Sequence, residues 1–234
     1  MGLQSEIAQR LAEVQQRLHE AVVRSGRQPG DVRLLVVSKT FSLAHIRAAA
    51  AAGQTDFGES RVQEALQKMD GSADLQIRWH LIGTLQSNKV RKAAARFSVI
   101  HSVDSLRLLE SIDTTSAEAG VSPELLVQVD LAGEATKHGA PPPQAMDVVR
   151  AGARCRAARL VGLMTIPPYE GDPEKARPYF AALRELRAAL IKEGLAPESL
   201  RELSMGMSHD FEIAVQEGAT LVRLGTAIFG KRHV

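Results

Sequence analysis

Lys39 closes the run Leu34-Leu35-Val36-Val37-Ser38-Lys39-Thr40, in which apolar and β-branched residues lead directly to a long cation. Such a run is typical of a strand that is buried on both faces, as in a parallel sheet. The lysine at its end has two interpretations. In the first, which the strand alone favours, the side chain extends to water. In the second, partial desolvation favours the uncharged amine, which can attack a carbonyl carbon and form a Schiff base.

Two short turns near the end of the chain combine small residues with hydroxyl groups, as anion-binding turns do. In residues 222–226, Gly225 allows close approach of the backbone to an anion, and Thr226 adds a hydroxyl and an N–H. Residues 204–208 contain Ser204, Gly206 and Ser208 in a similar arrangement. Either turn alone is equally compatible with an ordinary strand-to-helix connection in which Ser208 caps a helix. Together they predict a phosphate site.

Arg223 and His80 are the other candidates, because each lies in an apolar stretch. A buried guanidinium needs a partner, so Arg223 either forms a structural ion pair, with Glu59 or another acid, or faces a ring nitrogen or carboxylate of a ligand. His80 could stack on a planar ligand or act as a base. A buried histidine whose ring nitrogens make their hydrogen bonds inside the protein core is the more common case.

Composition excludes several classes of protein. The 234 residues are 44% hydrophobic and 24% charged, which is ordinary for a globular fold and too apolar for disorder. Lys and Arg number 29 against 27 for Asp and Glu, and they are dispersed, which argues against nucleic-acid binding. Cys155 is the only cysteine, so no internal disulfide forms. No signal peptide or bilayer-length apolar run is evident, and we predict a cytoplasmic protein without a membrane anchor.

The order of elements predicts how these residues are positioned. An amphipathic helix over residues 5–24, with Ile7, Leu11, Val14, Leu18, Ala21 and Val22 on one face, precedes eight strands near residues 36, 56, 80, 100, 127, 162, 203 and 223. Each strand is followed by a helix-like segment, which predicts an α/β protein, a single (β/α)8 TIM-like barrel with an extra N-terminal helix. A doubly wound sheet is the alternative, but no Gly-x-Gly-x-x-Gly follows the first strand. In a barrel, Lys39, Glu59, His80, Met164, Ser204 and Arg223 all fall near the strand ends that face the active site.

The motifs in combination resemble the pyridoxal phosphate homeostasis proteins, whose fold is similar to the barrel domain of alanine racemase. The matching segments are residues 37–40, 57–59, 62–65, 79–83 with 85–89, 133–137, 162–164, 203–208 and 222–230. They follow the order of the family and span nearly the whole chain, so residues 1–234 are expected to form one PLP-binding barrel domain. Two positions depart from the family pattern, Ser60 in place of Asn and Thr84 in place of Pro.

The resemblance implies that the cofactor is pyridoxal 5′-phosphate (PLP) and that Lys39 carries it as a Schiff base. It also implies that Ser204, Gly206, Gly225 and Thr226 surround the phosphate and that Arg223 faces the pyridine nitrogen. His80 is expected near the cofactor ring, and Met164 is expected among the cofactor-binding residues.

The implied function is intracellular PLP homeostasis and amino- and keto-acid balance, without established catalysis. The chain stops soon after the eighth strand, whereas an alanine racemase has a further domain and a tyrosine from a partner subunit, which argues against racemisation. A PLP-dependent racemase of unusual design stays the alternative, and a class I-type aldolase that uses Lys39 without coenzyme is the third. The expected partners are PLP and PLP-dependent apo-enzymes, and a monomer is expected.

Overall fold

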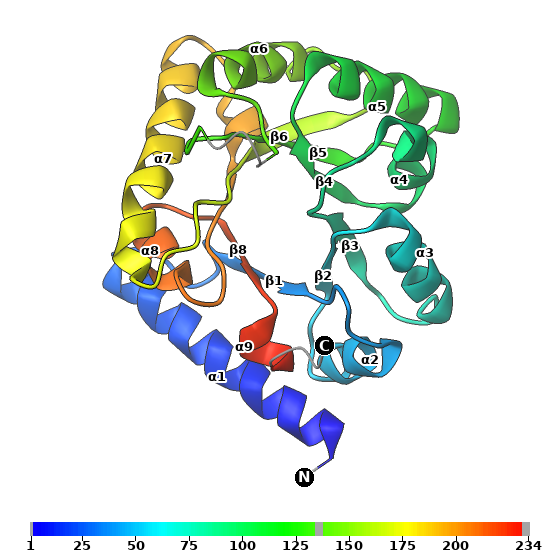
Figure 1. Cartoon of the computed structure of the whole chain (residues 1–234), viewed down its shortest axis with the longest axis vertical. Coiled ribbons are helices and arrows are strands. Elements are labelled where there is room, and N and C mark those ends of the chain that lie inside the picture. Colours follow the sequence, from blue (N-terminus) through cyan, green and yellow to red (C-terminus); the bar gives the residue numbers. More distant parts are fainter. Residues whose placement is uncertain (1, 134–137, 231–234) are drawn as a thin grey trace.

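Eight parallel strands close into a barrel in chain order, from β1 to β8 and back to β1 (Figure 1). The computed structural model describes residues 2–133 and 138–230. The strands are β1 Arg33–Val37, β2 Asp56–Glu59, β3 Arg78–Leu81, β4 Val99–Val103, β5 Glu124–Gln128, β6 Arg159–Met164, β7 Glu202–Ser204 and β8 Leu221–Leu224. This confirms the predicted (β/α)8 barrel and its strand positions, and the alternative of an open doubly wound sheet is wrong.

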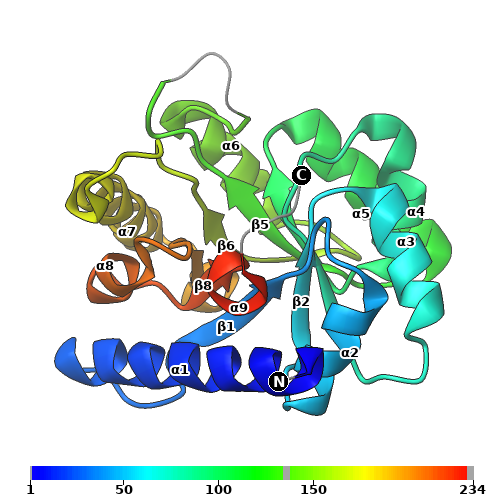
Figure 2. The ribbon, with the colours of Figure 1, turned by 60° about the horizontal axis from the view of Figure 1, so that its bottom comes forward.

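Helices form an outer ring, as apolar helix faces packed against a fully buried parallel sheet require. They are α1 Leu3–Arg24, α2 Leu43–Ala51, α3 Val62–Gly71, α4 Val90–Arg96, α5 Leu106–Ala119, α6 Pro142–Gly152, α7 Arg177–Lys192, α8 Phe211–Gln216 and α9 Thr226–Phe229, with short 3-10 turns at Ser87–Lys89, Pro173–Ala176 and Pro197–Leu200. The predicted apolar face of α1 is the face that is buried, and α1 packs against α2, α8 and α9 (Figures 1 and 2).

Strand packing is tight enough at one point to require glycine. Gly162 in β6 pairs with Glu202 of β7, and a Cβ atom added at residue 162 would lie 2.0 Å from the Glu202 carbonyl oxygen. A side chain there would have to displace backbone atoms, because non-bonded carbon and oxygen atoms do not approach so closely. The glycine therefore allows β6 and β7 to stay in register.

Two helix starts differ from the sequence prediction. The capping-box spacing of Ser60 and Gln63 predicts that Ser60 caps a helix, and the sequence predicts another helix from Ser208 to Glu217. In the structure, α3 follows Arg61 without a side-chain cap, and α8 begins at Phe211 after Asp210. Capping patterns in the sequence are misleading here because the residues between a strand and its helix form a longer turn. Both serines instead lie in the wall of the cavity described below.

No helix in the described ranges is long and apolar enough to cross a membrane. Within the same ranges, no cluster of three or more His, Cys, Asp or Glu side chains could hold a metal ion. Residues 134–137 of the predicted Gly133–Lys137 motif lie outside the described part of the chain.

Candidate functional site

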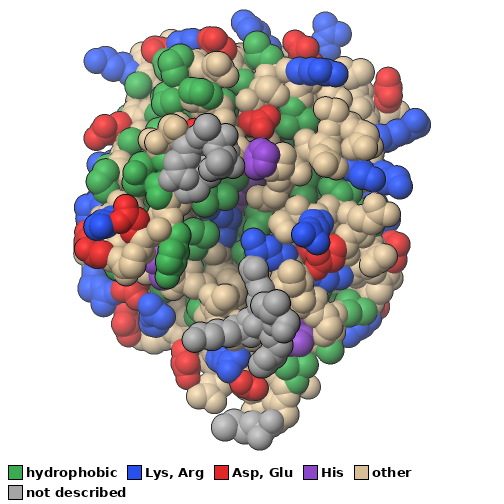
Figure 3. Space-filling view, viewed as in Figure 1, with side chains coloured by type: hydrophobic (Ala, Val, Ile, Leu, Met, Phe, Trp, Pro, Cys, Tyr) green, Lys and Arg blue, Asp and Glu red, His purple; other side chains and the backbone are tan. Residues whose placement is uncertain are grey.

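A cavity of about 580 Å³ opens at the carboxyl ends of the strands, in the middle of the face seen in Figure 3. Blue Lys and Arg side chains and a purple His side chain show inside this hollow among hydrophobic ones. The lining residues are Val37, Lys39, Ser60, Ile82, Gly83, Thr84, Gln128, Val129, Asp130, His138, Ile166, Tyr169, Met207, Ser208, His209, Arg223, Gly225 and Thr226. This is the end of a TIM-like barrel at which active sites are built.

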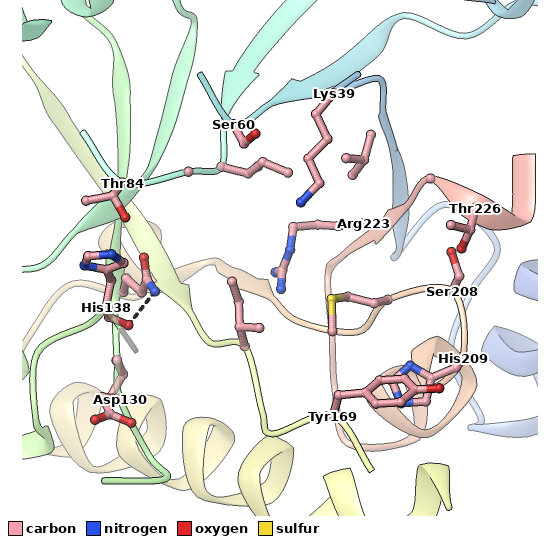
Figure 4. Close-up of a pocket in the computed structure, with 18 residues that line it drawn as sticks. Lys39, Ser60, Thr84, Asp130, His138, Tyr169, Ser208, His209, Arg223 and Thr226 are labelled. Atoms are coloured by element: carbon pink, nitrogen blue, oxygen red, sulfur yellow. Dashed lines mark hydrogen bonds between the residues drawn. The ribbon is translucent and has the colours of Figure 1, made fainter. Parts of the chain in front are cut away.

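Lys39 lies in the turn that follows β1, and its half-buried side chain extends into the cavity (Figure 4). The next residue, Thr40, has a φ of 70°, which is unusual for a β-branched residue and costs about 1–3 kcal/mol. Its backbone N–H donates to Glu64 Oε1 over 2.7 Å. The strained turn is therefore held by α3, and it fixes the point from which the Lys39 side chain starts.

A buried ion network supports the same turn from the other side. Lys68 Nζ donates to Glu59 Oε1, to Glu64 Oε1 and to the Ser38 carbonyl oxygen, over 2.7, 2.7 and 2.8 Å. The Ser38 hydroxyl also donates to Glu59 Oε1 over 2.7 Å. Burial raises the pKa of Glu59, and the hydrogen bonds from Lys68 and Ser38 oppose this shift. Both chain neighbours of Lys39 are thus anchored, so the network positions the amine without contacting the cavity.

Arg223 extends from β8 into the cavity, where Figure 4 draws its guanidinium below the Lys39 amine. It is 4% exposed, and its Nη1 donates to Ser204 Oγ over 2.8 Å and its Nη2 to the Thr165 carbonyl oxygen over 2.9 Å. Burial lowers the pKa of this guanidinium to about 10. Of the interpretations left open for Arg223, the structural ion pair with Glu59 does not form, because Glu59 pairs with Lys68. Arg223 is instead a buried cation held by neutral oxygens, with part of its surface turned to the cavity.

The two hydroxyl-bearing turns meet on one side of the cavity. Ser208 Oγ accepts a hydrogen bond from the Ala227 N–H over 3.3 Å, and Figure 4 draws Ser208 and Thr226 side by side. Gly225 lies close to the end of β1, where a Cβ atom would be 3.0 Å from the Val37 carbonyl oxygen, tighter than most such contacts. The hydroxyls of Ser208 and Thr226 therefore converge next to the end of the strand that precedes Lys39.

Comparison with known proteins places this geometry in a family. The model of the family described as "Alanine racemase, N-terminal domain" matches residues 9–233. The pyridoxal phosphate homeostasis protein of Pseudomonas aeruginosa is 44% identical over 229 residues, which cover 97% of this chain and 96% of the relative. The chain belongs to the pyridoxal phosphate homeostasis protein family. A second member, from Aquifex aeolicus, is 42% identical over 224 residues and is covered to 97% of its length.

A solved structure agrees with the fold. PipY of Synechococcus elongatus, solved with PLP bound, superimposes with a TM-score of 0.84 at 42% sequence identity. The match covers 96% of this chain and the whole of that one. The resemblance inferred from the motifs is thereby confirmed at the level of family and fold.

Four of the eight site residues predicted for this family member lie in the cavity wall, namely Lys39, Arg223, Gly225 and Thr226. Of the described residues, the wall does not include His80, Met164, Ser204 or Gly206. Met164 packs in a small apolar cluster with Val99, Leu126 and Val161. Gly206 lies beneath the turn, with a φ of 93° and no room for a side chain beside Ala214. His80 and Ser204 are buried and bonded to other side chains.

Sequence reasoning missed the side of the cavity opposite Lys39. Gln128 ends β5 and Asp130 follows it, Tyr169 lies in the loop after β6, and His209 lies in the loop after β7. The Asp130 carboxylate accepts the backbone N–H groups of its own turn, and the Tyr169 ring packs on His209 with centroids 4.8 Å apart. Their position directly after predicted strands was the available signal, but these residue types are common in ordinary turns.

Proposed function

We propose that this chain binds PLP through Lys39 and takes part in PLP homeostasis as a carrier without catalytic turnover. The observation that carries the proposal is the convergence, in one cavity, of an amine, a buried guanidinium and two hydroxyl-bearing turns. Support comes from the names of relatives that are 42–44% identical and from the PipY structure with PLP bound.

The donors present fit the chemical groups of PLP. Lys39 offers an amine for the aldehyde, Ser208 and Thr226 offer hydroxyls for the phosphate, and Arg223 offers N–H donors for the ring nitrogen. Condensation of the aldehyde with the amine releases one water molecule, and hydrolysis reverses it, so the cofactor can be stored and returned. The anchored turn around Lys39 orients the amine, while the half-buried position leaves water able to reach it.

Arg223 favours storage over turnover. A guanidinium is a permanent donor with no acceptor site, so it cannot hold the ring nitrogen protonated as a carboxylate would. A PLP ring without that proton withdraws electrons less effectively from an attached carbon. His80, Met164, Ser204 and Gly206 are not part of this proposal as direct contacts, because they do not line the cavity among the described residues.

The test is spectroscopic and then chemical. The protein purified with PLP should show an absorption band at the edge of the visible region, and borohydride reduction should place the label on the peptide that contains Lys39. A label on Lys89 or Lys137 would contradict the assignment. A protein that shows no band but condenses a carbonyl substrate with Lys39 would favour the aldolase.

Transfer to PLP-dependent apo-enzymes, the monomeric state and the cytoplasmic location stay predictions. Mixing the loaded protein with an apo-enzyme in the presence of a PLP-trapping phosphatase tests direct transfer, because only PLP that never becomes free would activate the apo-enzyme. Light scattering on the purified chain tests the monomer.

A further inference from the structure

A chain of hydrogen-bonded side chains crosses the barrel interior and ends at Arg223. Asp56 Oδ1 lies 2.9 Å from His80 Nε2, and His80 Nδ1 lies 2.9 Å from His101 Nε2. His101 Nδ1 lies 3.0 Å from Ser204 Oγ, which accepts from Arg223 Nη1. Since β4 and β7 are not neighbours in the sheet, the contact between His101 and Ser204 spans the lumen.

Strand register explains how the chain climbs through the barrel. Asp56 pairs with Arg78 and His80 pairs with Val99, so His80 and His101 each lie two residues further along the neighbouring strand. Residues two apart share a face of a strand, and diagonal neighbours are within reach of long side chains. The path therefore runs from the amino ends of the strands, where Asp56 begins β2, to the cavity at their carboxyl ends.

The hydrogen-bonded chain of side chains runs in one donor-to-acceptor direction, which is set by its acidic end, Asp56. Burial raises the pKa of Asp56, but the hydrogen bond from His80 and the charge of Arg78 outweigh this, so its pKa is lowered and it is a carboxylate that only accepts. Burial lowers the pKa of His80 and lowers that of His101 well below the usual value, so both rings are neutral. A neutral imidazole has one donor and one acceptor nitrogen.

Each donor then determines the next. His80 must donate from Nε2 to Asp56, which leaves its Nδ1 as an acceptor for the Nε2 proton of His101. His101 Nδ1 in turn accepts from the Ser204 hydroxyl. Because the Ser204 hydroxyl donates its proton to His101, its oxygen accepts from Arg223 through a lone pair. The hydroxyl is therefore not a donor toward the cavity.

We propose that His101 and Ser204 are positioning residues that orient Arg223 in the cavity, and that Asp56, at the opposite end of the barrel, sets the direction of the chain. The cofactor readout below rests on the proposed function, whereas the readout on the unloaded protein does not. In this arrangement the guanidinium is clamped between Ser204 Oγ and the Thr165 carbonyl oxygen. Losing the Ser204 acceptor would let it turn toward other oxygens.

The first test measures the histidine tautomers by ¹⁵N NMR of the unloaded wild-type protein. Both His80 and His101 should be neutral with the proton on Nε2. In Asp56→Asn, whose amide can donate as well as accept, the chain can reverse, so a fraction of both rings should carry the proton on Nδ1. A cationic His101, or Nδ1 protonation in the wild type, would overturn the proposal whether or not the protein binds PLP.

The second test compares variants at residue 101 in the PLP-loaded protein. His101→Phe removes the acceptor for Ser204 and should shift the absorption band in the same direction as Arg223→Gln. His101→Gln can accept from Ser204 and donate to His80, so it should restore the wild-type band. Ser102→Ala is the matched control, because Ser102 is buried beside His101 on β4 and its hydroxyl has no hydrogen-bond partner in the described structure.

Identical bands in His101→Phe, Ser102→Ala and the wild type would show that the chain does not position Arg223. If the wild type shows no band, the proposed function fails and the tautomer measurement still decides the direction of the chain. Thermal unfolding identifies a variant that fails to fold, in which case Ser204→Ala repeats the test on the next link.

Discussion

The two ends of the barrel use charged residues in opposite ways. At the amino end, strands begin with Arg33, Asp56, Arg78, Glu124, Arg159 and Glu202. Glu124 accepts from Arg78, from Arg159 over 3.3 Å and from Arg201 over 2.8 Å, and Glu202 accepts from Arg33 over 2.6 Å. At the carboxyl end, Lys39 and Arg223 line a cavity instead.

This difference separates stability from binding. The amino end satisfies its charges across strands, so it closes the barrel with ion pairs. At the carboxyl end two cations line the cavity, and buried groups hold the segments that carry them, Lys68 beneath Lys39 and Ser204 beneath Arg223. Substitutions at the two ends should therefore separate loss of folding from loss of binding.

Lys39→Ala should have the largest effect, a complete loss of covalently attached PLP. The free energy of unfolding should change by less than about 1 kcal/mol, since β1 and the hydrogen bond from Thr40 to Glu64 remain. Borohydride labelling and urea unfolding measure the two quantities. Lys89→Ala, outside the cavity, is the control and should keep the label. Retention of the label in Lys39→Ala would place the reactive amine elsewhere.

Glu124→Gln should show the opposite pattern at the amino end. The Glu124 side chain is 11% exposed and its carboxylate accepts from three arginines, so neutralising it leaves their charges uncompensated. We expect a loss of about 1–3 kcal/mol, below that of a fully buried pair because the arginines are partly exposed. PLP binding should not change. Glu118→Gln, on the exposed side of α5, is the control for the loss of one charge.

An equal stability of both glutamate variants would show that the ion pairs at the amino end contribute nothing measurable. Reduced PLP binding in Glu124→Gln with unchanged stability would show that the two ends are not separable.

Much of the fold and part of the cavity could be predicted from the sequence, because helices and strands leave periodic patterns of apolar residues. The apolar spacing of Ile7 to Val22 and the repeated strand signals depend on local sequence, so α1 and the barrel followed from it, and so did the cavity residues Lys39, Gly225 and Thr226. The network of Lys68 and the chain through His101 were not predictable. The Lys68 network depends on how α3 packs against the ends of β1 and β2. The chain through His101 depends on strand register and on a contact across the lumen, where His101 and Ser204 lie 103 positions apart in the sequence.

The buried histidines predict a loss of stability in mild acid. Burial lowers the pKa of His80 and His101, whereas unfolded histidine titrates near about pH 6.5. The unfolded chain therefore binds protons first, so this contribution is complete above about pH 6.5 and declines as the pH falls further. Each histidine adds up to about 1.4 kcal/mol per pH unit to the slope.

His101→Gln should flatten that slope by the share of one histidine. Urea unfolding between pH 8 and pH 5 measures it, and His19→Gln on the exposed face of α1 is the control. Burial raises the pKa of Glu59, so Glu59 affects the slope with the opposite sign. Because Glu59 is present in both proteins, its effect cancels when their slopes are compared. A slope that is the same in His101→Gln and the wild type would mean that folding does not shift the pKa of His101.

The smallest expected effect is on racemisation, where we predict no turnover above that of free PLP. Reversing a stereocentre requires a proton donor and acceptor on each side of the carbon. Lys39 can serve one side, and the phenol of the described cavity wall, Tyr169, packs on His209 on the side away from Lys39 (Figure 4). In the proposed site, Arg223 would also make PLP a weaker electron sink. Incubating the loaded protein with L-alanine in deuterated water tests this by NMR. Cα deuteration with inversion, faster than with free PLP and absent in Lys39→Ala, would make the protein an enzyme, and its dependence on Tyr169→Phe would identify the second proton carrier.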